Sequence, residues 1–287
     1  MFKNTMKTTV LLAAMGGLIV AVAGLIGGGS TASLTIGLGL ALVMVGGSYW
    51  FSDKLALASA KAHVIQREEA PEFYDIVASL ASRAGMPMPR VAISPSEQPN
   101  AFATGRSPKH AVVCATTGLL QSMPRAEIEG VMAHELMHVK HRDILIGSVA
   151  AAIATAISWI AQMAMFASVF GGGRSDDDRP NPLAMLLMSL LAPIAASLIQ
   201  MAVSRSREFE ADRGAAELLG SGHSLADALE RIEVLAARRP MAVAPAQAQA
   251  YIHNPLNELR GGRNSSMARL FSTHPATEER IRRLRAI

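Results

Sequence analysis

The chain has 287 residues, of which 50% are hydrophobic and 17% charged, and its mean hydropathy is +0.27. This composition argues against a wholly soluble protein and predicts that part of the chain lies in a lipid bilayer. The single cysteine, Cys114, excludes an intrachain disulfide bond. The formal charge of +4 comes without any basic stripe of interleaved aromatic residues, which argues against nucleic-acid binding.

Four apolar runs without Asp, Glu, Lys or Arg are each long enough to cross a bilayer. They cover about Thr8–Gly29, Leu34–Phe51, Ile144–Phe170 and Leu183–Val203. Helical residues rise ~1.5 Å each, so roughly 20 of them match the ~30 Å hydrocarbon core. We therefore expect four transmembrane helices. The alternative, buried helices of a soluble α protein, is disfavoured because the runs have no polar stripe at helical spacing.

The first run also has features of a secretory signal, since Lys3 and Lys7 precede it and it contains an Ala-x-Ala sequence. It is longer than the ~7–15 residues of a signal core, and a second run follows closely, so we expect an uncleaved transmembrane hairpin at residues 1–52. Lysine and arginine flank all four runs on the same side. This distribution predicts that both termini and the polar segments are cytoplasmic.

Residues 53–143 are predicted to form a cytoplasmic α/β segment. A helix over Pro71–Ala84 has proline in its first turn, an apolar face, and a glycine directly after it. Three candidate strands follow, divided by turn sequences, and we expect them to form a small antiparallel sheet: Arg90–Ser94, Asn100–Gly105 and His110–Gly118.

The next helix is expected to begin near Pro124 and to meet no helix-breaking residue until it enters the third apolar run. Residues 144–203 then form a second transmembrane hairpin. The remaining residues, 204–287, are predicted to be a cytoplasmic helical segment that completes the functional site. Its helices end at Gly220 and near Pro240, and a last basic helix begins near Pro275.

The sequence MAHELMHVKH lies on the helix that leads to the third run. His134 and His138, four residues apart, project from one face of that helix, and Glu135 stands beside it. In the His-Glu-x-x-His pattern, two neutral imidazoles hold Zn²⁺ and the carboxylate serves as general base and then general acid in hydrolysis. Histidines on the surface of a helix can produce this short pattern by chance. The neighbouring residues of the motif are small or apolar, however, which favours a site for one zinc ion.

A catalytic zinc ion usually has three protein ligands, so a further one is required. His141 is near in sequence, but one rigid helix cannot easily wrap three residues from two turns around a tetrahedral ion. Glu208 is the better candidate, because it directly follows the fourth run, whose cytoplasmic end must lie beside that of the third. Asp212, one turn later, would accept a hydrogen bond from a ligating histidine. Taken alone, both acids would be interpreted as an exposed charged helix.

With these residues in place, the chain resembles the HtpX type of integral-membrane zinc metalloprotease, a family akin to the CAAX prenyl-protein proteases. The resemblance covers nearly the whole chain. It depends on the order of the first apolar pair, PNAFATG, HELMH, the second apolar pair, SREFEAD and STHPATEERI. It implies a mainly α membrane protein with four transmembrane helices and a cytoplasmic α+β zincin-like protease domain of the gluzincin type, located in the inner membrane.

The resemblance also assigns site residues. It implies that His134, His138 and Glu208 bind Zn²⁺, that Glu135 is the catalytic acid and base, and that Asp212 supports a ligand. It further implies that NAFATG is an edge strand to which the substrate adds, with the cleaved bond near two of its residues, Asn100 and Ala101. A histidine and an arginine of the last motif would stabilise the tetrahedral oxyanion, and these are His274 and Arg280.

The function implied is a zinc-dependent endopeptidase that hydrolyses misfolded or damaged membrane proteins at the cytoplasmic face, in quality control and the stress response. Its partners would be membrane-protein or unfolded-polypeptide substrates and the bilayer; the oligomeric state is left open. A CAAX-type prenyl-protein peptidase is disfavoured because four spans do not make a larger enclosing bundle. A non-enzymatic zinc-binding membrane scaffold or transporter is disfavoured because Gln162 and Gln200 provide too few polar groups within the runs.

Overall fold

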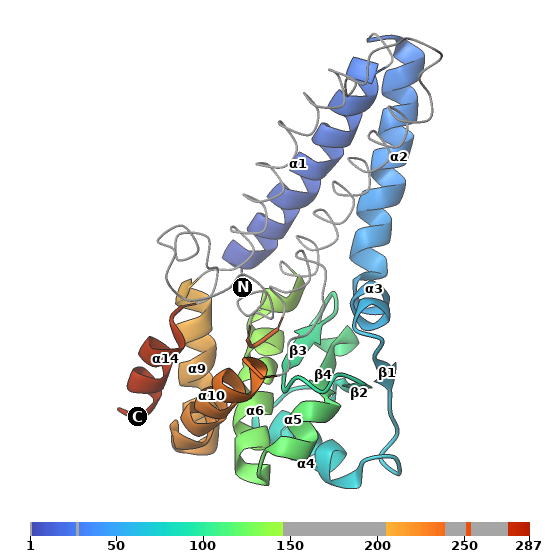
Figure 1. The fold of residues 1–287 in the computed structure, drawn as a ribbon. Coiled ribbons are helices and arrows are strands. Elements are labelled where there is room, and N and C mark those ends of the chain that lie inside the picture. Colours follow the sequence, from blue (N-terminus) through green and yellow to red (C-terminus); the bar gives the residue numbers. More distant parts are fainter. Residues whose placement is uncertain (1, 27–28, 146–204, 239–250, 254–274) are drawn as a thin grey trace, which may run out of the picture.

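The computed structural model describes residues 2–26, 29–145, 205–238, 251–253 and 275–287 (Figure 1). The predicted third and fourth apolar spans fall outside this set, apart from the first two residues of the third span, Ile144 and Leu145. In Figure 1 a pair of N-terminal helices stands away from an α/β part that contains all the other described elements.

Two apolar helices form the N-terminal pair, α1 (Phe2–Ile26) and α2 (Thr31–Trp50). They approach so closely that a Cβ at Gly37 of α2 would lie 2.6 Å from the Cβ of Ala23 in α1. Among the described residues, one helix is long and apolar enough to cross a bilayer, and that helix is α2; α1 contains a shorter apolar stretch, Leu12–Ala21. Four membrane spans therefore stay a prediction.

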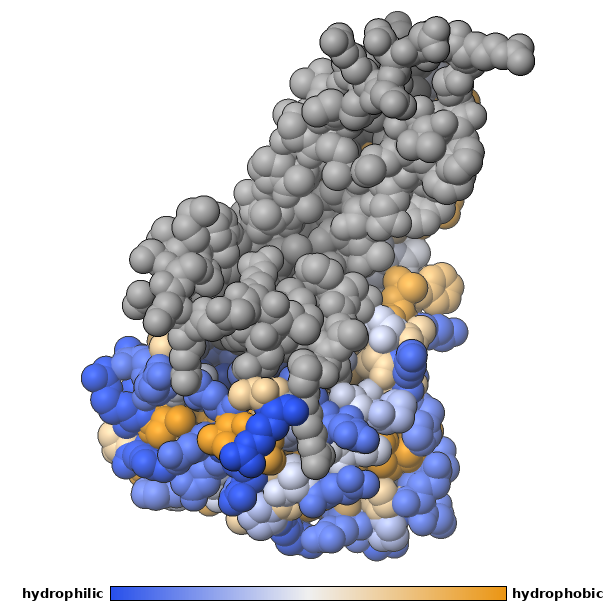
Figure 2. Space-filling view, viewed as in Figure 1, coloured by the Kyte–Doolittle hydropathy of each residue, from blue (hydrophilic) through white to orange (hydrophobic). Residues whose placement is uncertain are grey.

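A short helix, α3 (Ser52–Ser59), connects the N-terminal pair to the α/β part. Figure 2 shows that the visible face of the α/β part is mainly hydrophilic, with small separate hydrophobic patches. Such a surface is expected of a segment that lies in water.

The α/β part contains a four-stranded sheet in the order β1-β2-β4-β3. Its strands are β1 (His63–Val64), β2 (Arg90–Ser94), β3 (Ala101–Thr104) and β4 (Val112–Thr116). The prediction of an antiparallel sheet is wrong for one pair, because β2 and β4 are parallel. The chain crosses from β2 to the far edge, where β3 forms, and returns in β4 between them. The expected strands are present, and β1 was not predicted.

Strands β3 and β4 are buried on both faces of the sheet, which explains their continuous run of small and apolar residues. Alternate residues such as Val113 and Ala115 face a large core shared with the helices, while Cys114 and Phe102 face a smaller cluster under α3. Helix α4 (Pro71–Arg83) packs its predicted apolar face into the larger core. Two short helical segments flank β4, a 3₁₀ turn (Pro108–His110) and α5 (Thr117–Ser122).

The centre of the fold is α6 (Arg125–His141), the helix that carries HELMH. It contacts α4 and β3. It also packs against two helices of the C-terminal part, α9 (Arg205–Leu219) and α10 (His223–Ala236). The last helix, α14 (Thr277–Leu284), packs against α9 and α10. Figure 1 shows α9 and α10 beside α6 on the side away from the sheet. Segments about 70 residues apart in the sequence are thereby held together.

The expectation that one helix runs without interruption into the third apolar run is wrong. Helix α6 ends at His141, and Arg142 adopts a left-handed conformation with φ 61°. This conformation is uncommon for a residue with a side chain and turns the backbone sharply. The turn brings Asp143 back toward the histidines of α6.

The packing of α6 gives a paired prediction of stability. A Cβ at Gly130 of α6 would lie 2.8 Å from the backbone nitrogen of Leu225, whereas one at Gly214 of α9 would lie 2.9 Å from the flexible Met137 side chain. We expect Gly130→Ala to lower the free energy of unfolding by ~1–3 kcal/mol through overpacking. Gly214→Ala should cost much less, because Met137 can rotate and alanine favours the helix. Denaturant unfolding of the full chain in detergent compares the two, and equal losses would contradict the packing described.

Candidate active site

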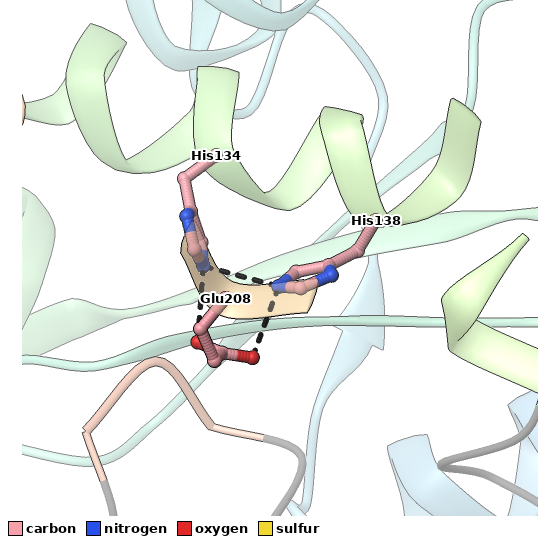
Figure 3. A group of neighbouring side chains, drawn as sticks. All are labelled: His134, His138 and Glu208. Carbon is pink, nitrogen blue, oxygen red and sulfur yellow. Dashed lines mark hydrogen bonds and ion pairs between the residues drawn. The ribbon is translucent and has the colours of Figure 1, made fainter. Parts of the chain in front are cut away.

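Two imidazoles and one carboxylate converge where α6 and α9 lie side by side. Nε2 of His134 and Nε2 of His138 are 3.1 Å apart. The Glu208 carboxylate reaches across from α9, with its oxygens 3.7 Å from His134 Nε2 and 3.5 Å from His138 Nε2 (Figure 3). The three ligand atoms all lie within 4.8 Å of one another. This donor set of two nitrogens and one oxygen, on two rigid helices, is that of a catalytic zinc site.

Each histidine has a carboxylate on its other ring nitrogen. Asp212 Oδ1 is 3.0 Å from Nδ1 of His134, and Asp143 Oδ2 is 3.4 Å from Nδ1 of His138. Such contacts fix the ring tautomer and leave Nε2 available to a metal ion. Asp212 was predicted in this position, but Asp143 was not. Asp143 follows the left-handed turn at Arg142, and no sequence pattern predicts that the chain bends back at this point.

The two histidines differ in protonation because their surroundings differ. Burial, together with the positive charge of Arg280, lowers the pKa of His134 to about 4, so this ring is neutral. Burial also acts to lower the pKa of His138, but the Glu208 and Asp143 carboxylates outweigh it and raise this pKa to about 9. The proton on His138 and a metal ion compete for one lone pair. A metal ion held by this residue would therefore displace a proton.

Glu135 lies next to the three ligands and is almost fully buried, at 2% exposure. Burial raises the pKa of its carboxyl to about 7, and the Glu208 charge adds to this. The positive charges of His138 and Arg280 and a hydrogen bond from the Ala103 backbone partly oppose the rise. A group with a pKa near neutrality can accept and return a proton near neutral pH. The chemistry expected of Glu135 from the sequence is thus compatible with its environment.

Arg280 of α14 forms the far wall of the site. Its guanidinium donates to both Asp212 oxygens, at 2.9 and 2.7 Å, and Nη2 lies 3.4 Å from Nδ1 of His134. Its Nη1 is 3.7 Å from a Glu208 oxygen. Burial raises the pKa of the Asp212 carboxyl, but Arg280 and His134 outweigh this and hold the pKa at about 2. Asp212 is therefore ionised, and its negative charge compensates the positive charge of the buried arginine.

The structure brings most of the predicted site residues together. His134, His138 and Glu208 form the cluster, with Glu135, Asp212 and Arg280 around it. Asn100 and Ala101 lie at the start of β3, whose Ala103 contacts Glu135. His274 is outside the described residues, so its predicted role stays a prediction. His141, the rejected third ligand, is not a member of the ligand cluster among the described residues.

A model of peptidase family M48 matches residues 67–287, more than half of the chain and all of the site just described. The chain belongs to peptidase family M48. Relatives of high similarity are named Protease HtpX homolog. Those of Burkholderia ambifaria strain MC40-6 and of Ralstonia nicotianae are each 52% identical over 285 residues, which cover 98% of this chain and 96% of the relative.

Among solved structures, the crystal structure of S. mikatae Ste24p is similar, with a TM-score of 0.50 and 20% identity. The similarity covers 99% of this chain and 66% of that one, and it supports the fold. The M48 peptidases are zinc metalloproteases, and the donor set formed by the two imidazoles and Glu208 fits zinc. The predicted enzyme class, zinc cofactor and HtpX-type resemblance are therefore confirmed.

Proposed function

We propose that this M48 peptidase is an endopeptidase embedded in the inner membrane, with its active site at the cytoplasmic face, and that it hydrolyses misfolded or damaged membrane proteins. The observation that carries the proposal is the connection between the apolar helix α2 and the site. The guanidinium of Arg106, just after β3, lies 4.7 Å from the ring centroid of Trp50 at the end of α2. Strand β3, which contacts the catalytic helix, thus ends close to the point where the apolar helix ends.

The aromatic residues at this junction support the same location. Trp50 and Phe51 are both more than half exposed, and Lys54 lies over the Phe51 ring. Exposed tryptophan and cationic side chains are enriched where a membrane helix meets water. A site held at this level would act on chains that are already in the bilayer.

For the reaction, we propose that His134, His138 and Glu208 hold one zinc ion. When bound there, zinc would polarise the scissile carbonyl and lower the pKa of water. Glu135 removes the proton from the attacking water and returns it to the leaving amine, a double role that its pKa of about 7 permits. Low exposure of all four side chains keeps bulk water away from these charges.

The remaining polar residues have supporting roles in this proposal. Asp212 orients His134 through its Nδ1 hydrogen bond. Arg280 places a positive charge beside the ligands and is itself fixed by Asp212, which suits a group that stabilises the developing oxyanion. His274 is proposed for the same task on the family resemblance. Asn100 and Ala101 would border the cleaved bond of a substrate paired to β3.

Purified full-length protein in detergent tests this function. We expect zinc-dependent cleavage of an unfolded membrane protein, loss of cleavage when a chelator removes the metal, and recovery when zinc is restored. A prenylated C-terminal peptide, offered in parallel, tests the CAAX-type alternative. Faster cleavage of the prenylated peptide than of the membrane protein would contradict the proposed substrate class. Absence of cleavage with zinc bound would contradict the endopeptidase itself.

A further inference from the structure

The edge of the sheet nearest the catalytic helix is formed by β3. On one side β3 pairs with β4 through all four of its residues. On its other side an unpaired edge would present backbone N–H and C=O groups to any extended chain. Peptidase substrates use such edges because main-chain hydrogen bonds require no particular side chains.

A segment of the chain itself, residues 251–253, lies along this edge. Phe102 and Tyr251 form an antiparallel bridge, and the Ile252 backbone N–H donates to the Ala101 carbonyl at 2.9 Å. The Tyr251 ring packs edge-to-face on Phe102, with centroids 5.0 Å apart. Tyr251 and Ile252 are each only 4% exposed, so this is a packed contact.

The side chain of Asn100 clamps the end of the segment. Its Nδ2 donates to the His253 carbonyl at 2.8 Å, and its Oδ1 accepts from the His253 backbone N–H at 3.2 Å. An asparagine amide that bonds both groups of one residue imitates the pairing of a neighbouring strand. The residue expected to border the scissile bond therefore holds the chain's own backbone.

The segment also contacts Arg280, which lies beside one of the metal ligands. The Ile252 carbonyl accepts from Arg280 Nη1 at 3.5 Å, and the same guanidinium lies 3.4 Å from His134 Nδ1. A substrate paired with β3 at Ala101 would need the hydrogen-bonding groups that Ile252 and His253 now use. The two chains cannot occupy this edge together.

We propose that residues 251–253 are an autoinhibitory strap, which occupies the position of a substrate strand on β3 and must leave before a substrate can bind. This inference rests on the proposed function, in which β3 is the substrate strand. The strap is antiparallel to β3, so it also indicates the direction in which a substrate would lie. Because the strap is part of the same chain, it is present at high effective concentration, and a substrate must compete with it.

A reversible crosslink between strap and strand tests the proposal. Phe102 and Tyr251 are directly opposed and flanked by the Ile252 hydrogen bond, an arrangement in which Cα atoms lie ~4.5 Å apart, within the range of a disulfide. The variant carries Phe102→Cys and Tyr251→Cys. Cys114 is replaced by alanine, because it pairs with Phe102 in the sheet and would compete for the new thiol. Each single cysteine variant serves as the oxidation control.

Two readouts separate failure of the strap from failure of the enzyme. In the first, with Glu135→Gln added to prevent turnover, binding of a fluorescent unfolded membrane protein is measured by anisotropy. We expect the oxidised form to bind at least tenfold more weakly than the reduced form. In the second, with Glu135 intact, cleavage should fall at least tenfold on oxidation and recover with dithiothreitol. Equal binding by oxidised and reduced forms, with the crosslink verified by mass, would overturn the strap and leave the endopeptidase unaffected.

A second variant leaves the packed rings intact. Ile252→Pro removes the N–H that donates to Ala101, whereas Ile252→Ala keeps it and serves as the matched control. A weaker strap should let Ile252→Pro bind the same fluorescent substrate several-fold more tightly than Ile252→Ala. Weaker binding by the proline variant would show that the segment helps to hold substrate, and would overturn the proposal.

Discussion

Replacing Glu135 with glutamine is expected to reduce peptide hydrolysis by ~10²–10⁴-fold while zinc binding stays intact, since a general acid–base group contributes about this much. Glutamine keeps the size of the side chain but cannot accept a proton. The ligands His134, His138 and Glu208 are unchanged, so the site still holds its metal. Initial cleavage rates of an unfolded membrane protein, measured beside the metal content of the same sample, provide the test.

The matched control is Glu129→Gln, made on the same helix. Among the described residues, Glu129 pairs with Arg125 one turn away on the partly exposed face of α6. Loss of that contact should leave the rate nearly unchanged. If Glu135→Gln cleaved as fast as the wild type, the proton would have to be accepted elsewhere and the proposed mechanism would fail. If the variant lost its zinc, the effect on the rate would instead report on the metal site.

Replacing Glu208 with glutamine is expected to reduce bound zinc well below about one ion per chain and to abolish hydrolysis with it. Three protein ligands are usual in catalytic zinc sites, and the neutral amide is a much poorer ligand than the carboxylate. Elemental analysis of purified protein, combined with titration against a competing chelator, measures the effect. The fold should survive, because Arg280 keeps its two hydrogen bonds to Asp212.

Glu210→Gln is the control for this experiment, because Glu210 is exposed on the same helix and is not a member of the ligand cluster. It should bind zinc and cleave as the wild type does. Full occupancy in Glu208→Gln would remove Glu208 from the proposed ligand set. The two histidines would then need a different partner.

The residues that were predicted well are those whose signal is local. The apolar face of α4 repeats at helical spacing, and both it and the strand Arg90–Ser94 formed where expected. His134 and His138 are one turn apart, so a helix alone places them together. Glu208 has no local signal, and its prediction depends on two adjacent apolar runs that return to the same side of the membrane.

The features that were not predicted depend on contacts between distant segments. The parallel pairing of β2 and β4 is decided by where β3 fits in the sheet, which no short pattern encodes. The strand His63–Val64 is too short to show any alternation. Asp143 reaches His138 only because Arg142 turns left-handed, and arginine carries no sequence signal for that conformation. Residues 251–253 lie between the predicted helices that end near Pro240 and begin near Pro275, where the sequence is rich in Ala, Pro, Gly and Asn and predicts no regular element.

Helix α6 is both the carrier of the reactive groups and the central support of the α/β part. Its buried side chains face the sheet, α4, α9 and α10, so nearly its whole circumference is enclosed. A substitution on α6 that changes the volume of a buried side chain would therefore disturb several packed elements at once. Exchanges that keep the size of the side chain, such as Glu135→Gln, should therefore be tolerated on this helix far better than exchanges that add or remove volume.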